Sequence, residues 1–574
     1  MRPALLFAAL LAATPAAAQE AAPPERTVSV SAEKAATADA FMVVAAHPLA
    51  ALAGYDALAA GGSAADAAVA VQAMLTLVEP QSSGLGGGAF ALYWDASEGR
   101  LTSFDGRERA PLSADPTYWL GPDGAPIPWR DAVVGGRSVG VPGTPMLLET
   151  LHARFGRLDR ADLVAPAIAT AEDGFAVSPR LAGLIEDAAD FALDRFPETR
   201  AYFFRPDGAP RAEGEILTNP ALAETLRLFA EQGAAPFYRG PLAEAIVEAV
   251  RTETNPGELT MEDFADYAVV ERAPVCVGYR GHEVCGMGPP SSGGLTVGQI
   301  LGMLEWFDMG DGGPTAEAWH LLAEASRLAF ADRALYMADA DHVAMPEGLL
   351  DPNYLAARAA LIDPTRAMDA AEAGLPPWKD ARRLAPQSQR ERPATSHFSI
   401  VDAEGDALSM TSSIETGFGS RLMVGGYLLN NELTDFSRAP ARNGAPVANR
   451  VEAGKRPRSS MAPTIVLRDG APVLLTGSPG GSRIIGYVAQ SLVAALDWGM
   501  SPAEAAALGH VLSRGGPVEL EDGPGVEAVA EALRARGHAV EIGDMNSGLH
   551  IIALEGGRLI GGADPRREGL PLGR

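Results

Sequence analysis

The sequence from residue 395 to residue 413 constrains local structure more than any other part of the chain. Apolar and hydroxyl residues alternate on both sides of Asp402–Asp406, a segment typical of a hairpin turn with Gly405 in the left-handed conformation. The register set by this turn places Phe398 opposite Met410 on an apolar face and gathers serines and threonines on the other face. We therefore expect a β-hairpin with one packed face. An ordinary half-exposed hairpin, with its hydroxyls in water, fits the same pattern.

Thr395 opens the first strand of this hairpin. It faces Ser413 in the expected register, and Glu415 would join the same polar face if the second strand continues. A threonine inside a chain is a poor nucleophile, because no neighbouring group need take its proton. A threonine at an N-terminus carries its own base, an α-amine with a pKa of roughly 8. Cleavage between Ala394 and Thr395 would therefore turn Thr395 into a nucleophile.

Six blocks of the sequence resemble the γ-glutamyltransferases, a family of N-terminal-nucleophile hydrolases. They keep the family's order, cover nearly the whole chain after its N-terminal segment, and lie at 105–111, 289–294, 395–399, 428–437, 455–464 and 477–482. The resemblance implies an α/β fold, a four-layer αββα sandwich in which the two cleavage products share one core. The alternation of helices with mixed strands is compatible with such a layered architecture.

The resemblance also implies the groups that surround the nucleophile. Gly480 and Gly481 match the family's oxyanion hole, a task that suits backbone amides without side chains in the way. Taken alone, the two glycines fit a tight turn equally well. Ser413 stands where the family commonly has a threonine beside the nucleophile, and it keeps the hydroxyl.

Two further groups match the family's substrate-binding residues. Arg107 matches the arginine that binds the substrate α-carboxylate, which suits its planar guanidinium, and Ser459 and Ser460 match the serines that share this carboxylate. A surface ion-pair cluster around Arg107 is the alternative. The substrate α-ammonium would be held by three carboxylates: Glu415, Glu432 and Asp435. Several better-known members carry neutral amides at the first two positions, and solvated surface acids are the alternative here.

The implied enzyme cleaves itself and then transfers the γ-glutamyl group of glutathione, or of another γ-glutamyl amide, through a threonyl ester. Water or an amino acid or peptide accepts the group, and neither a metal nor an organic cofactor is required. The large piece, 19–394, and the small piece, 395–574, would stay associated as a heterodimer. A related amidase acting on glutaryl-β-lactams is the alternative within this fold, although a glutaryl group has no α-amine for the three carboxylates to hold. A binding protein that never cleaves is the alternative from another class.

The N-terminal residues predict export. A basic residue precedes an apolar stretch at 4–13, and Ala16–Ala18 supplies a small-residue cleavage pattern, so 1–18 is typical of a signal peptide. The stretch is too short to span a bilayer. We expect a periplasmic or secreted protein without a membrane anchor once the signal is removed. The net charge of −27 argues against nucleic-acid binding and mainly reflects a solvated acidic surface.

Cys276 and Cys285 would face one another across a hairpin that turns at Arg280 and Gly281. A disulfide and two buried thiols both fit this spacing, and neither cysteine is given a catalytic role. The glycine-rich segment 84–89 imitates a dinucleotide-binding motif, but a helix precedes it and a strand follows, so we reject that function.

The remaining pattern predicts the main elements. We expect helices at 50–60, 64–78, 316–336, 485–498 and 526–536, strands at 90–94 and 101–105, and a mainly helical stretch at 141–270. Ser63 and Asp66 predict a capping box at the start of the second helix. Residues 366–393 are charged, rich in alanine and proline, and weakly periodic, as expected of a segment that leads to a cleavage point.

Overall fold

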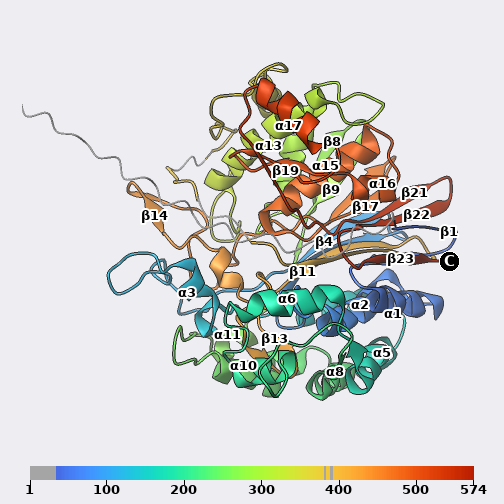
Figure 1. The fold of residues 1–574 in the computed structure, drawn as a ribbon, viewed down its shortest axis with the longest axis vertical. Coiled ribbons are helices and arrows are strands. Elements are labelled where there is room, and N and C mark those ends of the chain that lie inside the picture. Colours follow the sequence, from blue (N-terminus) through green and yellow to red (C-terminus); the bar gives the residue numbers. More distant parts are fainter. Residues whose placement is uncertain (1–33, 380–382, 388–391) are drawn as a thin grey trace, which may run out of the picture.

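Two seven-stranded antiparallel sheets form the centre of the protein (Figure 1), which we describe from a computed structural model. The structure describes residues 34–379, 383–387 and 392–574, so the expected signal peptide lies outside the described residues. The first sheet, in spatial order, is β1 (Lys34–Ala38), β22 (Arg558–Ala563), β21 (His550–Glu555), β17 (Ala471–Thr476), β16 (Thr464–Arg468), β9 (His282–Gly286) and β8 (Val275–Tyr279). The second is β23 (Leu570–Gly573), β2 (Met42–Ala45), β10 (Ser396–Val401), β11 (Ala407–Ser413), β3 (Gly88–Asp95), β4 (Arg100–Gly106) and β7 (Val270–Arg272).

Helices cover the outer face of each sheet and complete four layers (Figure 1). The second sheet packs on α1 (Pro48–Ala59), α2 (Ala64–Val78), α4 (Thr144–Phe155), α5 (Arg160–Asp173), α6 (Pro179–Ala189), α7 (Pro197–Phe203), α8 (Pro220–Gln232), α9 (Ala235–Arg239), α10 (Pro241–Ala249) and α11 (Met261–Ala265). The first sheet packs on α12 (Gly293–Leu304), α13 (Ala316–Tyr336), α14 (Pro352–Ala359), α15 (Ile484–Leu496), α16 (Pro502–Ala507) and α17 (Val526–Ala535). The expected αββα sandwich is confirmed.

Short elements lie around this frame. They are α3 (Trp129–Val133), the 3-10 helices η1 (Gly136–Ser138), η2 (Glu432–Asp435) and η3 (Gly481–Arg483), and the strands β5 (Phe175–Ala176), β6 (Ile216–Leu217), β12 (Met423–Val424), β13 (Tyr427–Leu428), β14 (Ala441–Arg442), β15 (Ala445–Pro446), β18 (Val511–Ser513), β19 (Val518–Glu521) and β20 (Val540–Gly543). The expected helices and strands are found within two residues of their predicted ends, and α2 and α13 match at both ends. The described residues of 366–393 form no helix or strand.

Local chemistry explains where α2 begins. The Ser63 hydroxyl accepts from the Asp66 N–H at 3.1 Å, and the Asp66 carboxylate accepts from the Ser63 N–H at 2.9 Å. This confirms the predicted capping box, which satisfies two N–H groups that a helix start leaves free. The glycine-rich segment after α2 leads directly into β3, which confirms that it opens no dinucleotide-binding helix.

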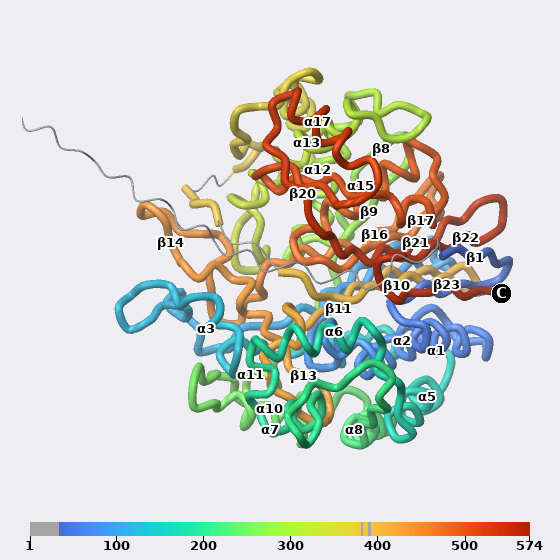
Figure 2. The backbone as a smooth tube through the Cα atoms, in the orientation of Figure 1, coloured from blue at the N-terminus to red at the C-terminus, as the bar shows by residue number. Residues whose placement is uncertain are grey.

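The hairpin β10–β11 has the predicted register and occupies the middle of its sheet (Figure 2). Its apolar face, including Phe398 and Met410, packs on the helices. Its hydroxyl face is buried against the other sheet, where Ser399 donates to the His550 carbonyl at 2.9 Å. The half-exposed alternative is therefore wrong, because sheet-on-sheet packing covers the polar face as well. The strand does not continue to Glu415, since β11 ends at Ser413 and Glu415 has a φ of 78°, so the condition for Glu415 to join the polar face of the hairpin is not met.

Cys276 and Cys285 form a disulfide across β8 and β9, as the predicted hairpin allows. Within residues 34–379, 383–387 and 392–574, no helix is both long and apolar enough to cross a bilayer.

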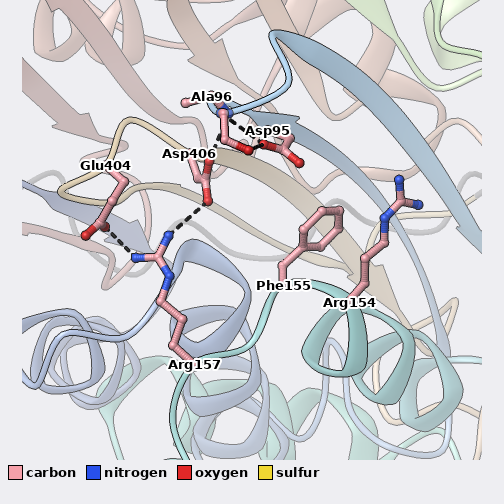
Figure 3. A pocket seen from close by; sticks show the side chains of 8 residues that line it. Asp95, Ala96, Arg154, Phe155, Arg157, Glu404 and Asp406 are labelled. Carbon is pink, nitrogen blue, oxygen red and sulfur yellow. Dashed lines mark hydrogen bonds and ion pairs between the residues drawn. The ribbon is translucent and has the colours of Figure 1, made fainter.

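One arginine holds the turn of the β10–β11 hairpin (Figure 3). Arg157, in the loop between α4 and α5, forms ion pairs with Glu404 at 2.5 Å and Asp406 at 3.3 Å. It also pairs with Asp402 at 3.6 Å. Burial, and then the neighbouring Asp406, raise the pKa of Asp402 to about 6. Arg157 therefore neutralises a turn in which three carboxylates would otherwise repel one another.

We expect Arg157→Met to lower the free energy of unfolding by about 1–2 kcal/mol, because it leaves these carboxylates unpaired. The loss should grow as the pH rises through about 6, where Asp402 ionises in the folded protein. Thermal unfolding at pH 5 and pH 8 measures both effects. Arg100→Met is the control, because the Arg100–Glu98 pair is half exposed. Equal losses in the two variants would contradict this role of Arg157.

Candidate active site

A small pocket lies where β10 begins and β11 ends. It has room for about one water molecule, at about 20 Å³. Its lining residues come from the end of β11, from η2, η3 and the start of α15, and from the segments that connect the strands: Arg107, Arg392, Ala394, Thr395, Ser413, Glu415, Glu432, Asp435, Ser459, Ser460, Met461, Gly481 and Ile484. All of the site residues predicted from the sequence line this pocket except Gly480, which directly precedes Gly481. Segments more than 300 residues apart in sequence therefore meet in one place.

The Ala394–Thr395 peptide group is held by a directed chain of hydrogen bonds. The Glu415 N–H donates to the Ser413 hydroxyl at 2.9 Å, and that hydroxyl donates to the Ala394 carbonyl at 3.1 Å. The Thr395 hydroxyl also contacts the Ala394 carbonyl and lies 3.4 Å from the Ser413 oxygen. Thr395 is only 3% exposed. The hydroxyl groups of Thr395 and Ser413 thus meet at one carbonyl oxygen.

Two buried charged residues that the sequence interpretation missed support the start of β10. Arg567 donates to the Thr395 carbonyl at 3.1 Å, and Glu79 accepts from the Ser396 hydroxyl at 2.8 Å. Both side chains are almost fully buried. Because these partners are 172 and 317 positions away in sequence, no local pattern could have revealed them.

Arg107, at the end of β4, is buried among carboxylates. It forms ion pairs with Glu432 and, at 2.7 Å, with Asp435, and its Nε donates to the Pro457 carbonyl at 3.1 Å. Although burial acts in the opposite direction, Glu432, Glu108 and Asp435 raise the pKa of Arg107 above its usual range. The guanidinium thus pairs with two of the three carboxylates predicted to bind the substrate ammonium. The surface-cluster alternative is wrong for Arg107, which is 1% exposed.

Three glutamates in or beside the pocket have raised pKa values: Glu108, Glu415 and Glu432. Burial, and then Asp435, raise the pKa of Glu415 well above its ordinary value, while the Asn431 amide donates to its carboxylate at 2.6 Å. Burial also raises the pKa of Glu432 well above the ordinary value and that of Glu108 to about 7. Glu108 is a third residue that the sequence interpretation missed, since its neighbours looked like a surface cluster. Burial thus makes Glu108, Glu415 and Glu432 bind protons more readily than ordinary glutamates.

Gly480 and Gly481 lie just before α15, with φ values of 133° and 58°. A Cβ atom on Gly480 would lie 2.7 Å from the ring of Tyr487, so both the conformation and the space favour glycine there. Backbone N–H groups at a helix start favour negative charge.

Ser459 and Ser460 both line the pocket, and Ser459 also contacts the block at 289–294. Ser459 pairs with Ser291 in a parallel bridge, and the Ser459 carbonyl accepts from the Ser292 hydroxyl at 2.6 Å. The Ser460 hydroxyl accepts from Arg333 at 2.6 Å. Two of the six blocks are therefore in contact, and the one at 455–464 contributes Ser459, Ser460 and Met461 to the lining of the pocket.

A threonine hydroxyl against the preceding carbonyl, at the start of a central strand of an αββα sandwich, is the arrangement of the N-terminal-nucleophile hydrolases. The chain belongs to the γ-glutamyltranspeptidase family, whose sequence profile matches residues 50–573. It is 37% identical to the glutathione hydrolase proenzyme of Bacillus subtilis strain 168 over 93% of this chain and 91% of that protein.

Acylases of the same superfamily are similar too. The chain is 36% identical to the acylase ACY 1 proenzyme of Pseudomonas sp. strain SE83, with 94% of each protein covered. The crystal structure of a cephalosporin acylase from Bacillus halodurans superposes with a TM-score of 0.83 at 30% identity, covering 95% of this chain and 97% of that one. Overall similarity therefore identifies an enzyme of this family. It does not distinguish a γ-glutamyl group from another acyl group as the group that the enzyme transfers.

Proposed function

We propose that the protein is a self-cleaving γ-glutamyltransferase. It takes the γ-glutamyl group from glutathione or a similar amide and passes it to water, an amino acid or a peptide. The observation that carries this proposal is the single pocket that joins Thr395 to Arg107 and three carboxylates. A γ-glutamyl donor has a carbonyl to be attacked, an α-carboxylate and an α-ammonium, and the pocket offers a partner to each.

The contacts at Ala394 support self-cleavage. In the proposed step, the Thr395 hydroxyl oxygen attacks the Ala394 carbonyl carbon while the Ser413 hydroxyl stabilises the developing oxyanion. The acyl group moves from the Thr395 nitrogen to its oxygen, and water hydrolyses the resulting ester. The pieces 19–394 and 395–574 stay together, because β10 is hydrogen-bonded to β2 in one sheet.

The free Thr395 amine then acts as the base for the Thr395 hydroxyl, which attacks the γ-carbonyl carbon of the donor. The N–H groups of Gly480 and Gly481 stabilise the tetrahedral oxyanion, and the amine leaving group takes the proton from Thr395. Arg107, Ser459 and Ser460 bind the α-carboxylate. For this, the donor carboxylate takes the place of Glu432 or Asp435 on Arg107. The three carboxylates then hold the α-ammonium: Glu415, Glu432 and Asp435.

The acylase relatives make a glutaryl amide the second candidate donor. A glutaryl group lacks the α-ammonium, so it would leave Glu415 and its neighbours facing no cation. We expect γ-glutamyl-p-nitroanilide to be favoured over glutaryl-p-nitroanilide by at least about 10-fold in kcat/KM, since an ion pair in a buried site contributes 1.4 kcal/mol or more. Preference for the glutaryl anilide would show that the proposed donor is wrong.

The ratio of these two activities should depend on pH. Because its pKa is raised, Glu415 is still protonated at pH values at which an ordinary glutamate is ionised. Only the ionised form of Glu415 pairs with an ammonium group. The ratio should therefore rise as the pH increases above the range in which an ordinary glutamate ionises, whereas titration of the Thr395 amine affects both donors and cancels. Glu415→Gln should flatten the profile. A wild-type ratio that does not change with pH would exclude Glu415 as the ammonium partner.

We also propose that the protein is exported, to the periplasm or beyond. The disulfide between Cys276 and Cys285 supports this, because disulfides persist in oxidising compartments.

A further inference from the structure

Arg392, three residues before Thr395, reaches into the pocket. Its guanidinium carbon lies 3.5 Å from the centre of the Trp129 ring. On α3, Trp129 also stacks in parallel on Phe191, with 5.5 Å between ring centres and 5° between planes. With Arg392 in place the pocket is almost full. Arg392 therefore fills space beside Thr395 that a leaving group or acceptor needs.

A second guanidinium belongs to Arg438, which follows η2, the 3-10 helix that contributes Glu432 and Asp435 to the pocket. Among the described residues, its Nε and Nη1 are buried without a hydrogen-bond partner. Burial, and then the charge of Arg392, lower the pKa of Arg438, while the charge of Glu415 raises it. The Arg438 guanidinium therefore lies within the electrostatic reach of both Arg392 and Glu415. A buried guanidinium with unsatisfied N–H groups favours a carboxylate, which Arg392 does not supply.

We propose that the place of the Arg392 side chain becomes the acceptor site once the chain is cut and residues 392–394 withdraw. An aromatic amino acid binds there, with its ring on Trp129 and its α-carboxylate on Arg438. The ring extends the stack that Trp129 makes with Phe191. The carboxylate satisfies Arg438, whereas a cationic side chain would meet a charge of the same sign. This inference rests on the proposed γ-glutamyl transfer.

The bound acceptor completes the transfer. Its neutral α-amine attacks the carbonyl carbon of the γ-glutamyl ester on Thr395, so that a C–N bond forms as the C–O bond to Thr395 breaks. One amine proton passes, through the Thr395 amine, to the Thr395 oxygen. The products are a γ-glutamyl amino acid and the free enzyme.

Transfer from γ-glutamyl-p-nitroanilide by the cleaved enzyme tests the role of Trp129. For wild type, kcat/KM for phenylalanine should exceed that for alanine by about 2- to 10-fold, the range of one aromatic stack. Trp129→Ala should bring this ratio to about one. Trp306→Ala is the matched control, because Trp306 is 64% exposed and follows α12 on the first sheet, whereas Trp129 contacts Arg392, and it should leave the ratio unchanged. No preference in wild type, or an unchanged preference in Trp129→Ala, would overturn the proposal.

Phenylalaninamide, which lacks the carboxylate, tests the role of Arg438. Wild type should prefer phenylalanine to phenylalaninamide by about 10-fold or more, and Arg438→Gln should remove that preference. A preference that survives in Arg438→Gln would overturn the assignment of Arg438. If wild type released no p-nitroaniline before any acceptor was added, the proposed function itself would be contradicted and this inference would fall with it.

Discussion

Thr395→Ala should yield one uncut chain with no measurable turnover of γ-glutamyl-p-nitroanilide. The hydroxyl that this change removes contacts the Ala394 carbonyl and has no substitute in the pocket, since Ser413 lies on the other strand and donates to the same carbonyl. Loss of a nucleophile typically lowers kcat by about 10⁴-fold or more. A denaturing gel and an anilide assay measure the two effects, and wild type should give two bands.

Thr395→Ser is the matched control for this experiment. It keeps the hydroxyl and loses only a methyl group, so the chain should still be cut and should keep a measurable part of its activity. N-terminal sequencing of the smaller wild-type band should begin at Thr395. Full activity in Thr395→Ala, or a wild-type chain that is never cut, would leave the binding-protein alternative as the better interpretation.

Much of the region around Thr395 could be predicted because its signals are local. The hairpin register follows from alternation and turn chemistry within 19 residues, and the α2 cap follows from two residues three positions apart. The residues proposed to bind the substrate are scattered over more than 300 positions. Only the resemblance of the six blocks to a family linked Arg107 to Glu432 and Asp435.

What the sequence did not reveal depends on packing between distant segments. The hydroxyl face of β10–β11 is buried because a second sheet covers it, and alternation along a strand reports only that its two faces differ. Glu415 reaches the pocket through a left-handed backbone conformation rather than through a longer strand. Arg567 and Glu79 reach the start of β10 from the far end of the chain and from the end of α2. Each of these contacts exists only after the layers have assembled.

Arg107→Lys should separate substrate binding from self-cleavage. Lysine keeps the positive charge among the buried carboxylates, so the fold should survive, but it cannot pair with a carboxylate through two parallel N–H groups. We expect kcat/KM for γ-glutamyl-p-nitroanilide to fall by about 10²-fold or more, since hydrogen bonds between charged groups contribute about 1.5–3 kcal/mol each. Cutting at Ala394 should continue, because the contacts at that carbonyl do not involve Arg107.

A donor whose α-carboxylate is replaced by a carboxamide makes the test specific. If Arg107 binds that carboxylate, wild type should lose about as much activity with the carboxamide as Arg107→Lys loses with the normal donor. The two changes together should then cost little more than one alone, which is the mark of two groups in contact. Arg272→Lys is the control, because Arg272 pairs with Asp105 and Asp341 outside the pocket and should show additive effects. Additive losses for Arg107→Lys would instead mean that Arg107 only neutralises Glu432 and Asp435, and that the donor carboxylate binds elsewhere.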